Sequence, residues 1–156
     1  MSLAIFLIKK ENFMYKISKP KHVIGFTGTR DGMTEIQRKT FKELLSIYEP
    51  HEFHHGDCIG ADAEAHTISK ELGFFVVIHP PRISTNRANC VGDRMEPVKE
   101  YLKRNEDIVM ASEVLFAIPK TEVEEIRSGT WSTIRKARQE KKTIYIIYPE
   151  GKVVKE

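Results

Sequence analysis

Short apolar runs alternate along the chain with segments in which apolar residues recur at helical spacing. Runs of this kind, bounded by glycine, proline or charged residues, are typical of buried strands. They predict five strands, over residues 23–27, 52–55, 74–78, 114–118 and 143–148. The helical spacing predicts four helices between them, one running from an N-cap at Thr34 to a stop at Pro50 and three over residues 61–72, 97–111 and 130–141.

The predicted strands are apolar at consecutive positions rather than at alternate ones, which indicates a sheet that is covered on both faces. Strands that alternate with helices favour parallel pairing with right-handed crossovers. We therefore predict an α/β fold, a three-layer Rossmann-like domain with about five parallel strands in the order 3-2-1-4-5. Residues 82–96 are interpreted as a long polar loop.

Residues 1–20 do not fit this alternation and are interpreted as an N-terminal extension, which leaves a single domain over residues 21–156. Within the extension, the apolar run Leu3–Ile8 has the length of an extra edge strand. A second interpretation is that Met14 is the natural start and residues 1–13 come from a vector or an alternate start.

Composition adds only broad limits. The chain has 156 residues, of which 40% are hydrophobic and 30% are charged, and its net charge is +3. These values exclude collagen-like, disordered and disulfide-scaffold classes, and the charge is too small to indicate nucleic-acid binding by itself. The two cysteines, Cys58 and Cys90, are far apart and predict free thiols in a reducing compartment. No run is long enough to span a bilayer, so we expect a cytoplasmic protein that does not bind membranes.

Ligands of such sheets bind beyond the carboxyl ends of the strands, near the point where the strand order reverses. This rule selects four loops before any motif is considered, over residues 28–32, 56–62, 80–94 and 120–129. Their composition is rich in glycine, hydroxyl residues, aspartate and arginine, which suits an anionic ligand.

In the first loop, Gly28 allows a ligand to approach the backbone, Thr29 offers a hydroxyl and Arg30 offers a forked donor for phosphate or carboxylate. The alternative is a tight turn that carries a surface arginine. The sequence is neither a GxGxxG motif nor a P-loop.

In the second loop, Gly56 and Gly60 flank a turn that opens an alanine-rich helix, and the free amides of such a helix start bind anions. Asp62 either caps this helix or bonds a sugar hydroxyl. Asp57 lies in the turn itself and is the first candidate for a catalytic carboxylate.

In the fourth loop, Ser128, Gly129 and Thr130 predict a second helix start suited to phosphate. Trp131 follows and is interpreted as a packing residue rather than as a base-stacking one. The last helix carries basic residues that are interpreted as a solvated face.

No metal, no cofactor and no cysteine nucleophile are expected from the sequence. His54 and His55 are adjacent on a strand and therefore point to opposite faces, while His66 follows eleven residues after His55 without a zinc-binding motif. Cys58 has no neighbour in sequence that would activate its thiol.

Taken together, these loops resemble the SLOG superfamily, which unites the Rossmann domain of DNA-processing protein A with the Lonely Guy phosphoribohydrolases. The layout is most similar to the small stand-alone YspA/YpsA-related group of phage and bacterial genomes. The resemblance covers residues 22–150 and rests on four motifs: Gly25-Phe26-Thr27-Gly28-Thr29-Arg30, His55-Gly56-Asp57-Cys58-Ile59-Gly60-Ala61-Asp62 with Ala65-His66, Arg104-Asn105 with Ile108-Val109, and Ser128-Gly129-Thr130.

The resemblance implies a nucleotide or nucleotide-derived ligand whose phosphate lies in the glycine-rich loops. The residues that resemble the family's contacts are Gly28, Arg30, Gly56, Asp57, Gly60, Asp62, Arg104, Asn105, Ser128, Gly129 and Thr130. Thr29 and Arg82 are further candidates for ligand binding. If an N-glycosidic bond is hydrolysed, the candidates for the catalytic carboxylate are Asp57, then Asp62 or Glu106. The glutamate of the Lonely Guy motif falls on Thr133, which is a departure from that mechanism.

Three functions remain open at this point. The leading hypothesis is binding of a nucleotide-derived small molecule, with or without hydrolysis, by a protein that forms homodimers. The second is a single-stranded nucleic-acid-binding module, because the last helix is basic and the long loop carries Arg82, Arg87 and Arg94. A dehydrogenase that binds NAD is the weakest, because the GxGxxG motif is missing.

Overall fold

The computed structural model describes residues 18–156, so the extra strand predicted for residues 3–8 lies outside the described residues. Seven strands form one sheet in the order β4-β3-β2-β1-β5-β6-β7, and six of them are parallel while β7 is antiparallel to β6. The strands are β1 (Ile24–Gly28), β2 (Glu52–His55), β3 (Phe75–Ile78), β4 (Arg94–Met95), β5 (Val114–Ile118), β6 (Thr143–Ile147) and β7 (Val153–Lys155).

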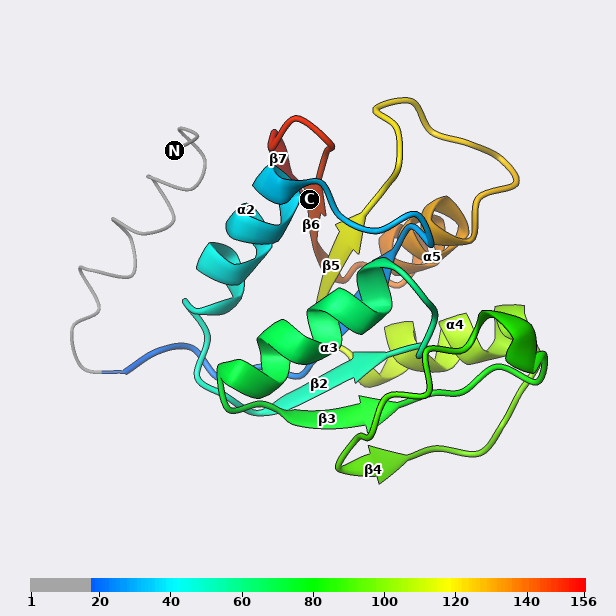
Figure 1. Cartoon of the computed structure of the whole chain (residues 1–156). Coiled ribbons are helices and arrows are strands. Elements are labelled where there is room, and N and C mark those ends of the chain that lie inside the picture. The colour runs from blue at the N-terminus through cyan, green and yellow to red at the C-terminus, as the bar shows by residue number, and fades with distance from the viewer. Residues whose placement is uncertain (1–17) are drawn as a thin grey trace.

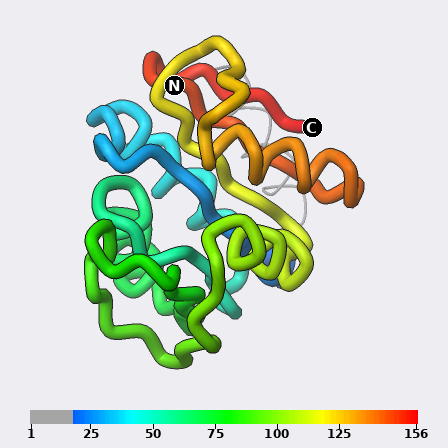
Figure 2. Tube along the Cα trace, turned by 90° about the vertical axis from the view of Figure 1, so that its right-hand side faces the viewer, coloured from blue at the N-terminus to red at the C-terminus, as the bar shows by residue number. Residues whose placement is uncertain are grey.

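Two pairs of helices cover the two faces of this sheet, which confirms the predicted three-layer architecture (Figure 1). The helices are α2 (Glu35–Leu45), α3 (Ala61–Glu71), α4 (Tyr101–Ala111) and α5 (Gly129–Gln139). The two pairs, α2 with α3 and α4 with α5, appear on opposite sides of the sheet in the turned view (Figure 2). None of the helices in residues 18–156 is long and apolar enough to cross a membrane.

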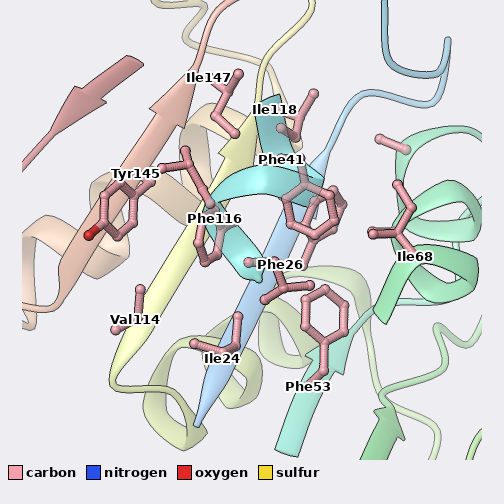
Figure 3. Close-up of a cluster of buried hydrophobic side chains, with 14 of the residues drawn as sticks. Ile24, Phe26, Phe41, Phe53, Ile68, Val114, Phe116, Ile118, Tyr145 and Ile147 are labelled. Atoms are coloured by element: carbon pink, nitrogen blue, oxygen red, sulfur yellow. The ribbon is translucent and has the colours of Figure 1, made fainter. Parts of the chain in front are cut away.

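The alternation of side chains along each strand explains why the apolar runs are continuous. In β5, Phe116 packs under α2 and α3, whereas Leu115 and Ala117 pack under α4 and α5. The larger cluster is aromatic, with Phe41 of α2 lying 5.5 Å from Phe116 between ring centroids (Figure 3). Both layers are therefore built from the same strands, and neither helix pair can be removed without exposing buried apolar surface.

The central five strands have the predicted order, and two short edge strands add to them. β4 lies within the predicted polar loop, and both of its residues are exposed, so no apolar pattern marks it. β7 follows the turn after β6 and is only three residues long. The N-cap at Thr34 is confirmed by a capping box with Gln37, whereas the helix predicted from residue 97 begins at Tyr101.

Candidate functional site

A cavity of about 740 Å³ opens at the carboxyl ends of β1, β2 and β5. Its volume falls in the range of small-molecule sites. The strand order reverses between β1 and β5, so the cavity lies where the architecture predicts a ligand site. Its walls come from the loops after β1, β2 and β5 and from the first turns of α4 and α5.

Most of the ligand-binding residues predicted from the sequence line this cavity. They are Gly28, Thr29, Arg30, Gly56, Arg104, Asn105, Ser128, Gly129 and Thr130, and of the predicted catalytic carboxylates Asp62 lines the cavity. The predicted Asp57, Gly60, Arg82 and Glu106 do not line it. The cavity lining also includes Tyr101, Lys120, Glu125 and Arg127, which the sequence did not single out.

The N-terminus of α5 supplies backbone donors to the cavity. Ser128 caps the helix, and its hydroxyl accepts a hydrogen bond of 3.3 Å from the amide of Trp131. The amides of Gly129 and Thr130 come before the first intrahelical bond and have no acceptor among the described residues. They therefore remain available to an anion, and the helix dipole favours negative charge at this point.

Three cationic side chains lie around the same helix start. Arg30 donates a hydrogen bond of 3.2 Å to the hydroxyl of Tyr101 and makes no ion pair within residues 18–156. Arg127 makes no ion pair in that region either, whereas Lys120 pairs with Asp31 at 2.8 Å. Two of the three cations thus have no neutralising carboxylate in the part of the chain that the structure describes.

Tyr101 and Arg104 connect α4 to the floor of the cavity. The Arg104 guanidinium is almost fully buried, and it donates to the carbonyl oxygens of Gly56 and His79, the latter at 2.9 Å. It also lies over the ring of Tyr101, with 4.6 Å between its Cζ atom and the ring centroid. The Tyr101 hydroxyl lies 3.3 Å from the Cys58 sulfur. Cation–π contacts of this kind fix the ring in place.

Asp62 is the buried carboxylate of the cavity. One of its oxygens accepts hydrogen bonds of 3.2 Å from the amides of Gly56 and Cys58, so the side chain holds the turn after β2. Burial raises the pKa of Asp62 to about 6, although the Arg104 charge and the two amides act in the opposite direction. The side chain therefore changes its charge in the physiological range.

The start of α3 holds the loop after β1 in place, whereas the sequence predicted that its free amides bind an anion. The amide of Ala61 donates to the carbonyl of Thr29 at 3.0 Å. Gly60 has φ +85°, and a Cβ atom there would lie 2.2 Å from the carbonyl oxygen of Arg30. A Cβ atom at Gly28 would similarly lie 2.5 Å from that of Ala61, so glycine allows the helix and the loop to approach.

Asp57 lies behind the cavity and holds the long loop. It is fully buried, with φ +56°, and one of its oxygens accepts bonds of 2.9 Å from Nε and Nη2 of Arg87. The other oxygen accepts a bond of 2.8 Å from the amide of Cys90. The structure thus places Asp57 in a structural clamp between the turn after β2 and residues 84–90.

Arg82 and Glu106 occupy exposed positions outside the cavity. Arg82 pairs with Glu100 at 3.0 Å, and both side chains are more than 60% exposed. Glu106 lies 3.5 Å from Lys103 and lines a smaller groove between α4 and α5.

One group of side chains has the composition of a metal site. Donor atoms of His55, His66 and Cys90 lie within 4.8 Å of one another. However, Nδ1 of His55 accepts the amide proton of Asp57 at 2.9 Å, which places the ring proton on Nε2, and Nε2 lies 3.0 Å from Nδ1 of His66. Neutral His55 therefore has no free lone pair for a metal, and the two histidines form a hydrogen-bond chain with the amide of Asp57.

The Asp57 clamp predicts a stability effect. Asp57→Ala leaves Arg87 without its buried partner and is expected to lower the free energy of unfolding by about 3 kcal/mol. Residues 84–90 should become accessible to proteases. The measurement is urea unfolding combined with limited proteolysis, and Glu100→Ala, which removes an exposed ion pair of the same loop, is the control and should change neither. Wild-type stability in Asp57→Ala would contradict the role of the clamp.

The raised pKa of Asp62 predicts how stability varies with pH. Because the folded protein binds the proton more tightly than the unfolded chain, the contribution of this group is greatest below about pH 4 and is lost as the pH rises through 6. Relative to Asp62→Asn, the wild type should therefore lose roughly 2 to 3 kcal/mol between pH 4 and pH 7. Urea unfolding at several pH values measures this difference, and parallel curves would show that the carboxyl titrates normally.

Two solved structures share the fold of this chain, although no model of a known protein family and no curated protein matches it. The molybdenum cofactor binding protein from the phototrophic bacterium Rippkaea orientalis aligns with a TM-score of 0.60 and 18% identity, over 84% of this chain and 78% of that one. DNA processing protein A (DprA) from Streptococcus pneumoniae aligns with a TM-score of 0.57 and 15% identity, over 81% of this chain and 50% of that one. The chain therefore has the Rossmann-like fold of these two structures, as the sequence pattern predicted.

Proposed function

We propose that this protein binds a nucleotide or a nucleotide-derived ligand, with a phosphate group at the N-terminus of α5. The observation that carries the proposal is the juxtaposition of the free amides of Gly129 and Thr130 with Arg30 and Arg127 in one cavity. Amides at a helix start and forked guanidinium donors suit phosphate oxygens. The volume of about 740 Å³ leaves room for more than the phosphate.

The likeness to solved structures is compatible with this proposal. One of them is named as a cofactor-binding protein, and the other as a DNA-processing protein. Both identities are below 20%, so these names are compatible with ligand binding but do not identify a ligand for this chain.

Single-stranded nucleic acid is the less favoured ligand because most cations that would bind its backbone are already paired. Arg87 pairs with Asp57, and Arg94 pairs with Glu52 and Glu96. On α5, Arg138 pairs with Glu124 and Glu156, and Arg135 with Glu124. Cations that are already paired with carboxylates neutralise few phosphates and so displace few counterions from the nucleic acid, and affinity for a phosphate backbone should be low.

We further propose that any hydrolysis of an N-glycosidic bond depends on Asp62. Of the three predicted catalytic carboxylates, Asp62 is the one that lines the cavity. A pKa of about 6 would allow this group to donate a proton to a leaving base or, when ionised, to stabilise a positive charge on the sugar. Glu125 also lines the cavity, on the loop before α5.

The binding proposal predicts a loss of affinity in Arg30→Ala. Removal of one charged donor to a phosphate should weaken binding of nucleoside monophosphates at least tenfold, as measured by isothermal titration calorimetry. Arg82→Ala removes an exposed arginine outside the cavity and should bind like the wild type. If no nucleotide binds to the wild type while single-stranded DNA shifts on a gel at low salt, the nucleic-acid alternative replaces this proposal.

The hydrolysis proposal predicts that Asp62→Asn stops the release of free base from a bound nucleoside monophosphate while binding persists. Asparagine can keep the acceptor for the amides of Gly56 and Cys58 but cannot supply the proton. Chromatography of the products measures the release, and Glu106→Gln is the control because Glu106 lies outside the cavity. Equal rates in the wild type and Asp62→Asn would remove Asp62 from the reaction.

A further inference from the structure

Asn105 has an amide whose orientation is fixed by its neighbour on α4. Its Oδ1 atom accepts a hydrogen bond of 2.8 Å from Nε of Arg104. The Arg104 guanidinium cannot turn away, because it is buried and its Nη1 atom is bonded to the carbonyls of Gly56 and His79. The reversed amide would place its NH2 group against the Nε proton of Arg104, so the oxygen must face the arginine.

The nitrogen of the same amide is left for a ligand. Nδ2 of Asn105 has no hydrogen-bond partner among residues 18–156, and the residue lines the cavity. An amide nitrogen carries two donors and no acceptor. The Nδ2 atom of Asn105 therefore offers hydrogen-bond donors to the cavity.

The surroundings of Asn105 on α4 are apolar. Leu102 and Ile108 lie three residues to either side, on the same face of the helix, and both line the cavity. Leu102 is 65% exposed, so its aliphatic surface is open to a ligand in the cavity. The phosphate cradle comes instead from α5 and from the loop after β1, so the α4 wall faces a different part of the ligand.

We infer that Asn105 is a specificity-determining residue that selects a ring carrying a carbonyl oxygen, that is, an oxo nucleobase rather than an amino nucleobase. The inference rests on the proposed binding of a nucleotide in this cavity. A flat ring would cover Leu102, and its carbonyl oxygen would accept from Nδ2 of Asn105. An amino group in the same place would set donor against donor and leave both unsatisfied, which disfavours binding.

Matched pairs of nucleotides test this selection. Inosine and adenosine 5′-monophosphates differ in having an oxygen beside a protonated ring nitrogen or an amino group beside an unprotonated one, and uridine and cytidine 5′-monophosphates differ in the same way. Calorimetric titration of the wild type should show about tenfold tighter binding of the oxo member of at least one pair.

Two variants separate the donor from the shape of the side chain. In Asn105→Asp, one carboxylate oxygen keeps the bond to Nε of Arg104 and the other becomes an acceptor, so the preference should reverse toward the amino member. In Asn105→Leu, the side chain has similar size without a donor, and the preference should disappear. Circular dichroism and thermal unfolding establish that both variants are folded.

The outcomes distinguish the selection by Asn105 from the proposed binding of a nucleotide. Equal affinity for both members of each pair in the wild type, or an unchanged preference in Asn105→Asp, would overturn the selection by Asn105 while nucleotide binding stands. Failure of the wild type to bind any of the four nucleotides would overturn the proposed function itself. A reversed preference in Asn105→Asp would establish Asn105 as the group that reads the ring.

Discussion

The buried guanidinium of Arg104 is the interaction on which the candidate site depends. Its donors reach the carbonyl oxygens of Gly56, after β2, and of His79, after β3, so one side chain ties α4 to the ends of two strands. Gly56 can have no side chain here, because a Cβ atom would lie 2.3 Å from the guanidinium. A buried guanidinium that lost its hydrogen bonds to these carbonyls would be costly in free energy. The bonds therefore fix the position of α4 relative to the sheet. Tyr101 and Asn105 take their places from this anchor.

Around this anchor, the structure separates cations that stabilise the fold from cations that face the cavity. The arginines on the long loop and on the outer side of α5 are paired with carboxylates. Arg30 and Arg127, in contrast, lie beside the open amides of α5 without a carboxylate partner in the described part of the chain. Because Arg104 is buried nearby, the cavity has an excess of positive charge that an anionic ligand would balance. The net charge of the whole chain is only +3, so it does not reveal this local excess of positive charge in the cavity.

Much of this arrangement could be predicted from local sequence signals. The apolar runs predicted the central strands, and the Ser128-Gly129-Thr130 stretch predicted a helix start that the structure places in the cavity. Tyr101 could not be recognised, because its importance arises from contacts with Arg30, Cys58 and Arg104, which reach it from other segments.

The two aspartates of the segment after β2 also have roles that the sequence could not distinguish. Asp57 and Asp62 have equal chemistry and lie five residues apart, yet one bonds Arg87 behind the turn and the other lines the cavity. The difference depends on the direction in which the left-handed backbone at Asp57 turns its side chain and on residues 84–90, which pack behind it. Sequence spacing carries no information about either. The edge strand β4 was missed for a related reason, since two exposed residues leave no pattern.

We expect an anionic ligand to bind at the start of α5 inside the cavity. Two-dimensional NMR of the isotope-labelled protein, titrated with inosine 5′-monophosphate, tests this binding most directly. The largest amide shifts should occur at Gly129 and Thr130, with the Nε signal of Arg30 moving at the same ligand concentrations. Shifts confined to the outer face of α5 or to residues 84–90, with Gly129 and Thr130 unmoved, would contradict it.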